Sequence, residues 1–336
     1  MNATIKDVAN LAGVSIATVS RVMNDNYFVS QVVKENVLDA IKQLNYLPNS
    51  VARSLRKDTT FTIGYAVSDI SNEHFTQIAR TVEDIVNKEN YNVIVCSTEN
   101  NKKREQDYLN LLISKKIDAL ILNTSGENDS LVASISEKMP IVLINRKVND
   151  PMFKGDFIDS DNNVGAYLLT SHLISYGHRK IGIINGLLSI NTGCERFEGF
   201  KRAMKEVNIN VDDTYPYMFN GNFTAESGYQ GAEAIMSRDD KPTAIVVMNN
   251  AMTIGALKYF RNHGISVPEE VSIASYGSIA NIELYYVQPS IVTMDAWTIG
   301  KKAGELILHR IKNKDATNKE IILTPQLLIG DGVKKI

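Results

Sequence analysis

From residue 62 onward, short apolar runs alternate with longer amphipathic segments, and this alternation constrains the fold more than any other feature of the sequence. The segment 74–88, for example, repeats Phe75, Ile78 and Val82 on one face of a helix. Strands are predicted at 63–67, 92–96, 119–123, 141–145, 181–185, 244–248 and 271–275. Strands that alternate with helices predict parallel sheets covered on both faces. Because seven such strands fit two sheets better than one, we predict an α/β body of two doubly wound parallel-sheet lobes.

A chain that builds two lobes in this way has to pass between them. Three segments suit such crossings by their polarity or irregular pattern: 157–165, 289–295 and 323–328. The predicted lobes are therefore 61–160 plus 291–323 for the N-terminal one and 161–290 plus 324–336 for the C-terminal one.

The residues before the body follow a helical pattern. The stretch "IKDVANLAGVSIATVSRVMN", residues 5–24, holds two short helical patterns separated by a turn at Gly13, and Ser15 is a natural N-cap for the second. A third helical pattern runs from about 30 to 45. We predict a helix-turn-helix domain at 1–46, followed by a hinge at 47–60.

The second helix of this motif carries small and hydroxyl side chains on its outward face where a solvated helix normally carries Glu and Lys. Ile16, Ala17, Thr18, Ser20 and Arg21 point outward. Small side chains let a helix approach base edges, hydroxyls can bond phosphates or bases, and Arg can fork onto guanine. The pattern predicts that this helix enters the major groove of double-stranded DNA.

Composition and charge agree with this interpretation. Residues 1–58 hold seven basic against five acidic side chains (+2), which leaves −4 for the rest of a chain whose net charge is −2. A mildly basic head on an acidic body suits a DNA contact confined to the head. With no apolar run of about 18 residues and no signal-peptide pattern, we expect a cytoplasmic protein. Cys96 and Cys194 are expected to be buried, reduced thiols.

The head and hinge, "TIKDVANLAGVSIATVSRVMN" and "LNYLPNSVARSLR", resemble those of the LacI/GalR family of bacterial transcription regulators. Segments 69–75, 160–204 and 242–273 of the body resemble the family as well, so the resemblance covers nearly the whole chain. It implies a body like a periplasmic sugar-binding protein, a homodimer on a pseudo-palindromic operator, and a small-molecule effector, a sugar or sugar derivative, held between the lobes. This would make the protein a transcriptional repressor.

The resemblance also implies that residues 49–56 form a hinge helix that packs against its dimer mate in the minor groove. Leu55 would wedge open the central base step, with Ala52 beside it and Asn49 positioning the backbone. A two-turn helix is marginal alone and would order on contact with DNA and a partner. The predicted DNA contacts are Ser15, Ile16, Ala17, Thr18, Ser20, Arg21, Asn24, Ser30, Asn49, Ala52 and Leu55.

The effector site is expected beyond the carboxyl ends of the strands, where open α/β sheets bind ligands. Asn145, Thr192, Arg196 and Asn249 follow strands and match ligand-contact positions of the family, where Arg196 often binds a hydroxyl or carboxylate. Phe75 and Phe223 match apolar or stacking positions. Asp295 completes the predicted effector set, although either Met294 or Asp295 could take the place of a Gln often found there.

Several carboxylates typical of the family are missing from this chain. Asn145 stands where Asp is common, Asn249-Asn250 replaces "ND", and 275–278 reads SYGS where a "GFDD"-like segment is usual. Carboxylates accept paired bonds from sugar hydroxyls, so their loss leaves a more neutral pocket with fewer counter-charges for Arg196. We predict an effector that is anionic, such as a sugar phosphate or acid, or is otherwise not a typical neutral monosaccharide; Asp295 could restore one acid.

Other functions suit the sequence less well. Glycine-rich nucleotide loops, a G-x-S-x-G elbow and paired histidines are all missing, so neither an enzyme nor a metal or cofactor site is expected. A free solute-binding protein would need an export signal and no DNA-binding head. A regulator whose main partner is a phosphorylated carrier protein, as in catabolite-control members of the family, stays an alternative. The ending "GDGVKKI" carries no heptad repeat, which favours a dimer over a tetramer.

Overall fold

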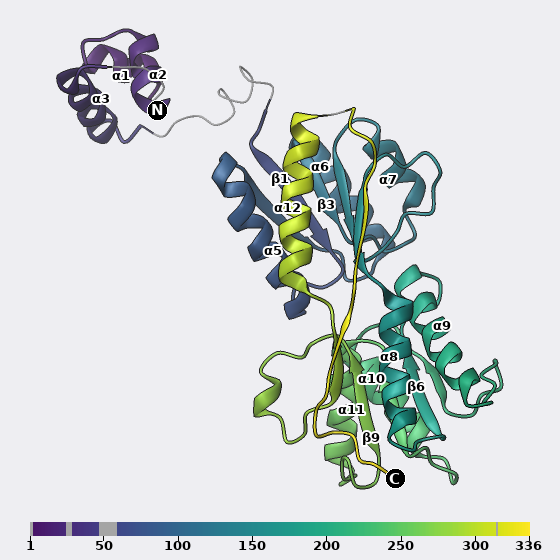
Figure 1. Ribbon diagram of the computed structural model, residues 1–336. Helices are drawn as coiled ribbons and strands as arrows, with labels where there is room; N and C mark the ends of the chain where they lie inside the picture. Colours follow the sequence, from purple (N-terminus) through teal and green to yellow (C-terminus); the bar gives the residue numbers. More distant parts are fainter. Residues whose placement is uncertain (1–2, 25–28, 47–58, 314) are drawn as a thin grey trace. The chain divides into compact units, whose positions relative to one another are not determined.

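The computed structural model describes residues 3–24, 29–46, 59–313 and 315–336. It divides into two compact units, a head (Met1–Thr60) and a body (Phe61–Ile336), which Figure 1 shows in sequence colours. The predicted hinge helix at 49–56 lies outside the described residues.

The head contains the three predicted helices, α1 (Ile5–Leu11), α2 (Ile16–Asn24) and α3 (Gln31–Gln43). Thr4 and Asp7 form a capping box at the start of α1, and Gly13 turns the chain with a φ of 65°. The amide of Thr18 donates to Ser15 Oγ at 3.1 Å, which confirms the predicted cap of α2. The helices pack around Val8, Ala9, Val19, Val22, Val37, Ala40 and Tyr46.

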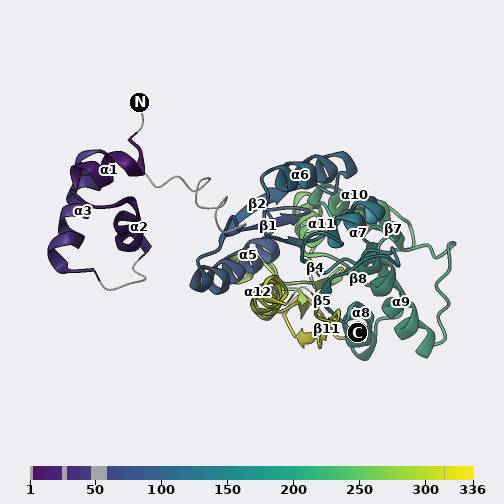
Figure 2. The ribbon, with the colours of Figure 1, turned by 90° about the horizontal axis from the view of Figure 1, so that it is seen from above.

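The first lobe of the body is a six-stranded parallel sheet in the order β11-β5-β4-β3-β1-β2. Its strands are β1 (Thr62–Val67), β2 (Asn92–Ser97), β3 (Ala119–Leu122), β4 (Ile141–Ile144), β5 (Asp156–Ser160) and β11 (Glu320–Leu323). Its helices are α5 (Glu73–Val86), with the short η1 (Asn87–Glu89) after it, α6 (Lys102–Ser114), α7 (Asp129–Ser136) and α12 (Ala296–Lys312). Helices α5 and α12 cover one face and α6 and α7 the other (Figure 2).

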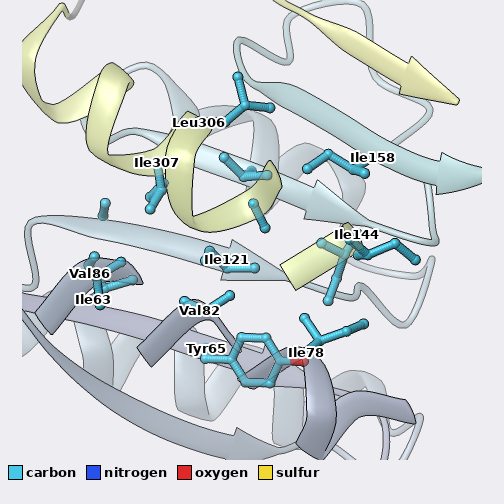
Figure 3. Packing of buried hydrophobic residues seen from close by; sticks show 14 of the residues in the cluster. Ile63, Tyr65, Ile78, Val82, Val86, Ile121, Ile144, Ile158, Leu306 and Ile307 are labelled. Atoms are coloured by element: carbon cyan, nitrogen blue, oxygen red, sulfur yellow. The ribbon is translucent and has the colours of Figure 1, made fainter. Parts of the chain in front are cut away.

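The core under α5 and α12 explains why these distant segments lie side by side. Ile78 and Val82 of α5 and Ile307 of α12 meet Ile121 and Ile144 of the sheet (Figure 3). All five side chains are fully buried. Burying each aliphatic side chain of this size contributes roughly 1.5–3 kcal/mol to stability. The shared core therefore holds α12, from late in the chain, beside α5 at the beginning of the body.

The second lobe is a six-stranded sheet in the order β12-β10-β9-β8-β6-β7. Its strands are β6 (Ile181–Asn185), β7 (Met218–Asn220), β8 (Ala244–Val247), β9 (Ser272–Tyr276), β10 (Ser290–Thr293) and β12 (Gln326–Leu328). Helices α8 (Asn162–Ser175) and α9 (Asn191–Glu206) cover one face, α10 (Ala225–Met236) and α11 (Asn250–Asn262) the other, and η2 (Ile282–Leu284) lies in a loop. All strand pairs are parallel except β10 with β12.

The seven predicted strands are confirmed, but strands also occur where crossings were expected. Residues 157–160 of the first predicted crossing belong to β5, a fully buried strand. The predicted lobe boundary at 291 falls inside β10, which pairs with β9 in the second sheet, so the chain changes lobes only after 293. Polar residues hid β5, because its buried carboxylates at 156 and 159 are satisfied by hydrogen bonds from Arg310, far along the chain, and from the nearby Asn162.

Two further sequence expectations can be compared with the structure. Cys96 is buried as predicted, whereas Cys194 is exposed on α9, so the expectation for that thiol was wrong. Within the described residues, no helix has both the length and the apolar content needed to cross a membrane.

A buried ion pair fastens α12 to the first sheet. Arg310 donates from Nε and Nη2 to the two carboxylate oxygens of Asp156, at 2.9 and 2.7 Å. The side chains are only 7% and 1% exposed, and the amide of Lys319 donates to the same carboxylate. Asp156 therefore holds the end of α12 and the start of β11 against β5.

Replacing Arg310 with Met should destabilise the body by about 3–5 kcal/mol, because it leaves the buried carboxylate of Asp156 without its counter-charge. Urea unfolding of the full chain measures the loss. Lys312→Met is the matched control, because Lys312 lies on the same helix as Arg310 but forms an exposed ion pair with Glu89 of η1. This substitution should cost less than about 1 kcal/mol. Equal losses in the two variants would contradict the buried-pair interpretation.

Candidate functional site: helix-turn-helix head and interlobe cleft

The exposed face of α2 is made of the residues predicted to contact DNA. Ser15, Ile16, Ala17 and Arg21 are exposed, and Thr18 and Ser20 are half-buried. The Ser15 and Thr18 hydroxyls also hydrogen-bond to each other at 2.9 Å. The described side chains on this face thus combine neutral polar and apolar groups with one cation at the end of the helix.

The remaining predicted DNA contacts are placed less completely. Ser30 is exposed at the start of α3 and makes no side-chain cap to that helix, which leaves its hydroxyl available to a phosphate. Asn24 ends α2. Asn49, Ala52 and Leu55 lie outside the described residues.

A cleft of about 810 Å³ lies between the two lobes of the body. The carboxyl ends of strands in both sheets meet there, as expected for open α/β sheets. Six of the seven predicted effector residues line it: Phe75, Asn145, Thr192, Arg196, Phe223 and Asn249. A cavity of this size accommodates a small organic ligand.

Asp295 does not line the cleft, and this corrects the expectation that it could restore an acid there. It caps α12 instead, accepting from the Thr298 amide at 2.9 Å and from its hydroxyl at 2.5 Å. The side chain that faces the cleft is Met294. Of the two alternatives at this position, the structure therefore favours the uncharged one.

Arg196 is a buried cation whose direct partners are neutral. Its Nε donates to Asn162 Oδ1 at 2.8 Å and its Nη1 to the Met248 carbonyl at 2.6 Å. Nη2 faces the Met294 sulfur at 3.5 Å, and the guanidinium lies 3.8 Å from the ring centre of Tyr276. The side chain is thus held in place without direct contact to a carboxylate of any described residue.

The sequence interpretation missed a second buried cation in the cleft, Arg146, which directly follows Asn145 at the end of β4. Its Nη1 donates to Asn100 Oδ1 and to the Thr124 carbonyl, at 2.7 and 3.0 Å. Its guanidinium lies 5.4 Å from the ring centre of Phe223 in the second lobe. A basic residue just after a strand was the available signal, because strand ends line such clefts.

Phe223 is placed by an uncommon backbone conformation. Its φ is 69°, and its ring lies directly against Gly186, where a Cβ would meet the ring at 2.0 Å. Only glycine fits at position 186 with the ring in this place. The aromatic side wall of the cleft therefore depends on a glycine that follows β6.

Asparagine side chains link the two lobes across the cleft. Asn72, the N-cap of α5, and Asn250, the first residue of α11, exchange two amide hydrogen bonds of 2.9 and 3.0 Å. Asn191 of α9 accepts from the Lys147 amide and donates to the Asn145 carbonyl. Neutral amides can exchange both bonds, which a carboxylate at position 250 could not do because it has no donor.

Burial changes the ionisation of the polar groups behind the cleft. Desolvation raises the pKa of Asp159 to about 7, against the opposing charge of Arg196. Desolvation also lowers the pKa of His74 to about 4. His74 is therefore neutral at pH 7, and its Nε2 lies 3.3 Å from Asn145 Oδ1. Among the described residues, no group of three His, Cys, Asp or Glu side chains could hold a metal ion.

Comparisons with known proteins agree with this division of the chain. Residues 4–49 match the family model described as bacterial regulatory proteins, lacI family, and residues 60–331 match the one described as periplasmic binding proteins and sugar binding domain of LacI family. The HTH-type transcriptional repressor PurR of Vibrio vulnificus is 34% identical over 334 residues, covering 99% of each chain.

Solved structures show the same architecture. A transcriptional regulator CelR–cellobiose complex aligns with a TM-score of 0.74 at 25% identity, covering 98% of this chain and 99% of that one. The lac repressor dimer bound to operator and the anti-inducer ONPF aligns with a TM-score of 0.85 at 24% identity, covering 99% of this chain and all of that one.

Asp159→Asn should change how stability depends on pH. At pH 5 the carboxyl is protonated in the folded body but ionised in the unfolded chain. Its contribution to the free energy of unfolding is therefore fully present below pH 4 and is lost as the pH rises to about 7. Between pH 5 and 8, urea unfolding should shift in favour of the variant by about 2 kcal/mol relative to the natural protein. Parallel stability profiles would show that Asp159 is already ionised at pH 5.

Proposed function

Because the chain belongs to the LacI family of bacterial regulatory proteins, we propose that it represses transcription by binding operator DNA under the control of a small molecule held in the interlobe cleft. We propose further that it acts as a homodimer on a pseudo-palindromic site. The observation that carries the proposal is that one chain holds both a small, weakly charged face on α2 and a cleft of about 810 Å³.

The chemistry of α2 supports reading of the major groove. Ile16 and Ala17 can contact thymine methyls, Thr18 and Ser20 can bond bases or phosphates, and Arg21 can fork onto guanine. A dimer brings two such helices to half-sites about one helical turn apart. Specificity would thus come from four or five side chains in each head.

The lining of the cleft supports a polar effector, for which we propose a sugar or sugar derivative. Amide side chains at Asn145 and Asn249 and the hydroxyl of Thr192 offer donors and acceptors to hydroxyl groups. Phe75 and Phe223 offer apolar faces to a ring. The similar regulator CelR was solved with the sugar cellobiose.

Control follows from the two-lobe construction. A ligand that contacts both lobes stabilises one lobe angle over others, and the first lobe is joined through residues 47–60 to the head. Such a shift of populations changes operator affinity by a coupling free energy of typically 1–3 kcal/mol. The coupling is reciprocal, so operator DNA would change effector affinity by the same factor.

Selection of random DNA by the full-length protein tests the proposal directly. We expect recovery of one pseudo-palindromic sequence, whose affinity then changes when fractions of a bacterial metabolite extract are added. Recovery of no preferred sequence, with or without extract, would overturn the proposal.

Arg21→Ala should weaken binding to the selected operator by about 1–3 kcal/mol and flatten the sequence preference at one base pair. Fluorescence anisotropy with single-base variants of the operator measures both effects. A loss of equal size on every sequence would mean that Arg21 contacts phosphate only. Lys102→Ala, an exposed change on α6 of the body, is the control and should leave DNA affinity unchanged.

Leu55→Ala tests the hinge, which lies outside the described residues. Removing an apolar wedge should reduce DNA bending and specific affinity, because the unstacked base step loses the side chain that fills it. Effector affinity should stay nearly the same. Gel mobility of circularly permuted operator fragments measures the bend, and an unchanged bend would contradict the wedge role.

A further inference from the structure

We propose that the cleft binds a small hydroxylated ligand through an oxyanion, a phosphate or a carboxylate, gripped between Arg146 of the first lobe and Arg196 of the second. The inference rests on the proposed effector role of the cleft and names the chemical class of the effector. It depends on two buried cations that approach from opposite lobes.

Arg146 has donors to spare. Arg146 is only 5% exposed, yet both of its hydrogen bonds to described residues come from Nη1. No described residue accepts from its Nε or Nη2. Three N–H groups of a guanidinium are therefore left for a ligand, in the fork geometry that matches an oxyanion.

Arg196 is neutralised just as incompletely. Its acceptors are an amide oxygen, a carbonyl oxygen and the Met294 thioether, which is a weak acceptor. Asp159, a buried acid on which the charge of Arg196 acts, is only partly ionised near neutral pH, because desolvation raises its pKa to about 7. An oxyanion would replace the weak sulfur contact with a charge-assisted hydrogen bond.

The two arginines line the same cleft from opposite lobes. Burial lowers the pKa of Arg146 to about 10, the charge of Glu105 opposes this shift, and the positive charge of Arg196 adds to it. Like charges in a partly desolvated space repel, so an anion between them gains from both at once. Such a ligand also joins the lobes, which is the contact that changes the lobe angle.

The acids around the cleft leave this positive charge in place. Glu99 forms an ion pair with Arg104 at the rim, and Asp69 Oδ1 accepts from the amide and hydroxyl of Ser71. Behind Arg146, Glu105 accepts hydrogen bonds from Ser125, Thr124 and Asn128. Glu195 accepts from Asn162 at 3.1 Å.

A buried acceptor beside the cations indicates that the ligand also carries a hydroxyl. Asn123 is 1% exposed and lines the cleft, and its Nδ2 donates to the Ile144 carbonyl at 3.1 Å. Its Oδ1 accepts from no described residue. Because an unsatisfied buried acceptor is costly, a ligand hydroxyl at this point is favoured. Sugar phosphates and hydroxy acids combine the two groups.

Calorimetric titration of the full-length protein tests the proposal with defined probes. Inorganic phosphate represents phosphate esters, malonate represents carboxylic acids, and glucose is the neutral comparison. We expect binding of phosphate, malonate or both, and no comparable binding of glucose. Binding of phosphate alone would assign a phosphate ester, and binding of malonate alone a carboxylic acid; an absence of both would overturn the proposal.

Single variants then locate the anion. Arg146→Gln and Arg196→Gln should each weaken binding of the anionic probe about tenfold or more, since each removes charge-assisted hydrogen bonds. Arg202→Gln is the matched control, because it removes an exposed guanidinium from the same helix as Arg196 and should leave the affinity within about twofold. Thermal unfolding verifies that all three variants fold.

The outcomes separate the clamp, by which we mean the grip of Arg146 and Arg196 on an oxyanion, from the proposed regulatory function. A loss in only one of the two cleft variants would overturn the grip from both lobes, and an equal loss in Arg202→Gln would mean that the anion binds to surface charge. Operator selection is measured on the same protein preparations. Anion binding without a preferred operator would leave the clamp in place while refuting the regulator.

Discussion

The parallel direction of the strands in both sheets, β12 excepted, is the constraint on which the site depends. Parallel strands place all their carboxyl ends at one edge, and the loops that follow β4, β6 and β8 therefore gather polar side chains there. Two such edges facing each other form the cleft. The chain crosses between the sheets near 161, 294 and 324, so the lobes share connections without merging into one core.

The cleft keeps charge in a place where charge is costly. Arg146 and Arg196 are buried with neutral direct partners, while His74 is uncharged and Asp159 is only partly ionised near neutral pH. The cleft therefore holds two cations without a full set of ionised acids to neutralise them, and this excess of positive charge favours an anionic ligand. The neutral amide pair between Asn72 and Asn250 closes part of the gap without adding charge.

The head, in contrast to the cleft, has few charged side chains at its proposed binding face. Its small core is made mostly of Val and Ala from three short helices, and the outward face of α2 carries neither Glu nor Lys. A helix that has to approach base edges gains from short side chains, whereas a solvated helix gains from charge. The two units of the chain therefore place positive charge differently: the head carries Arg21 near the end of α2, and the body holds Arg146 and Arg196 inside its cleft.

The sequence by itself determined the three helices of the head and seven of the twelve described strands, because their apolar periodicity is a local property of the chain. It also placed four cleft residues, since positions after parallel strands converge whatever the details of packing, and the family resemblance added Phe75 and Phe223. Only the tertiary structure decided that Asp156 and Asp159 lie inside a strand, that Met294 rather than Asp295 faces the ligand space, and that Arg146 joins Arg196. These outcomes depend on contacts between residues far apart in the chain, such as the partner of Asp156 at a separation of 154 residues, and no local pattern records which distant groups will neutralise a buried charge.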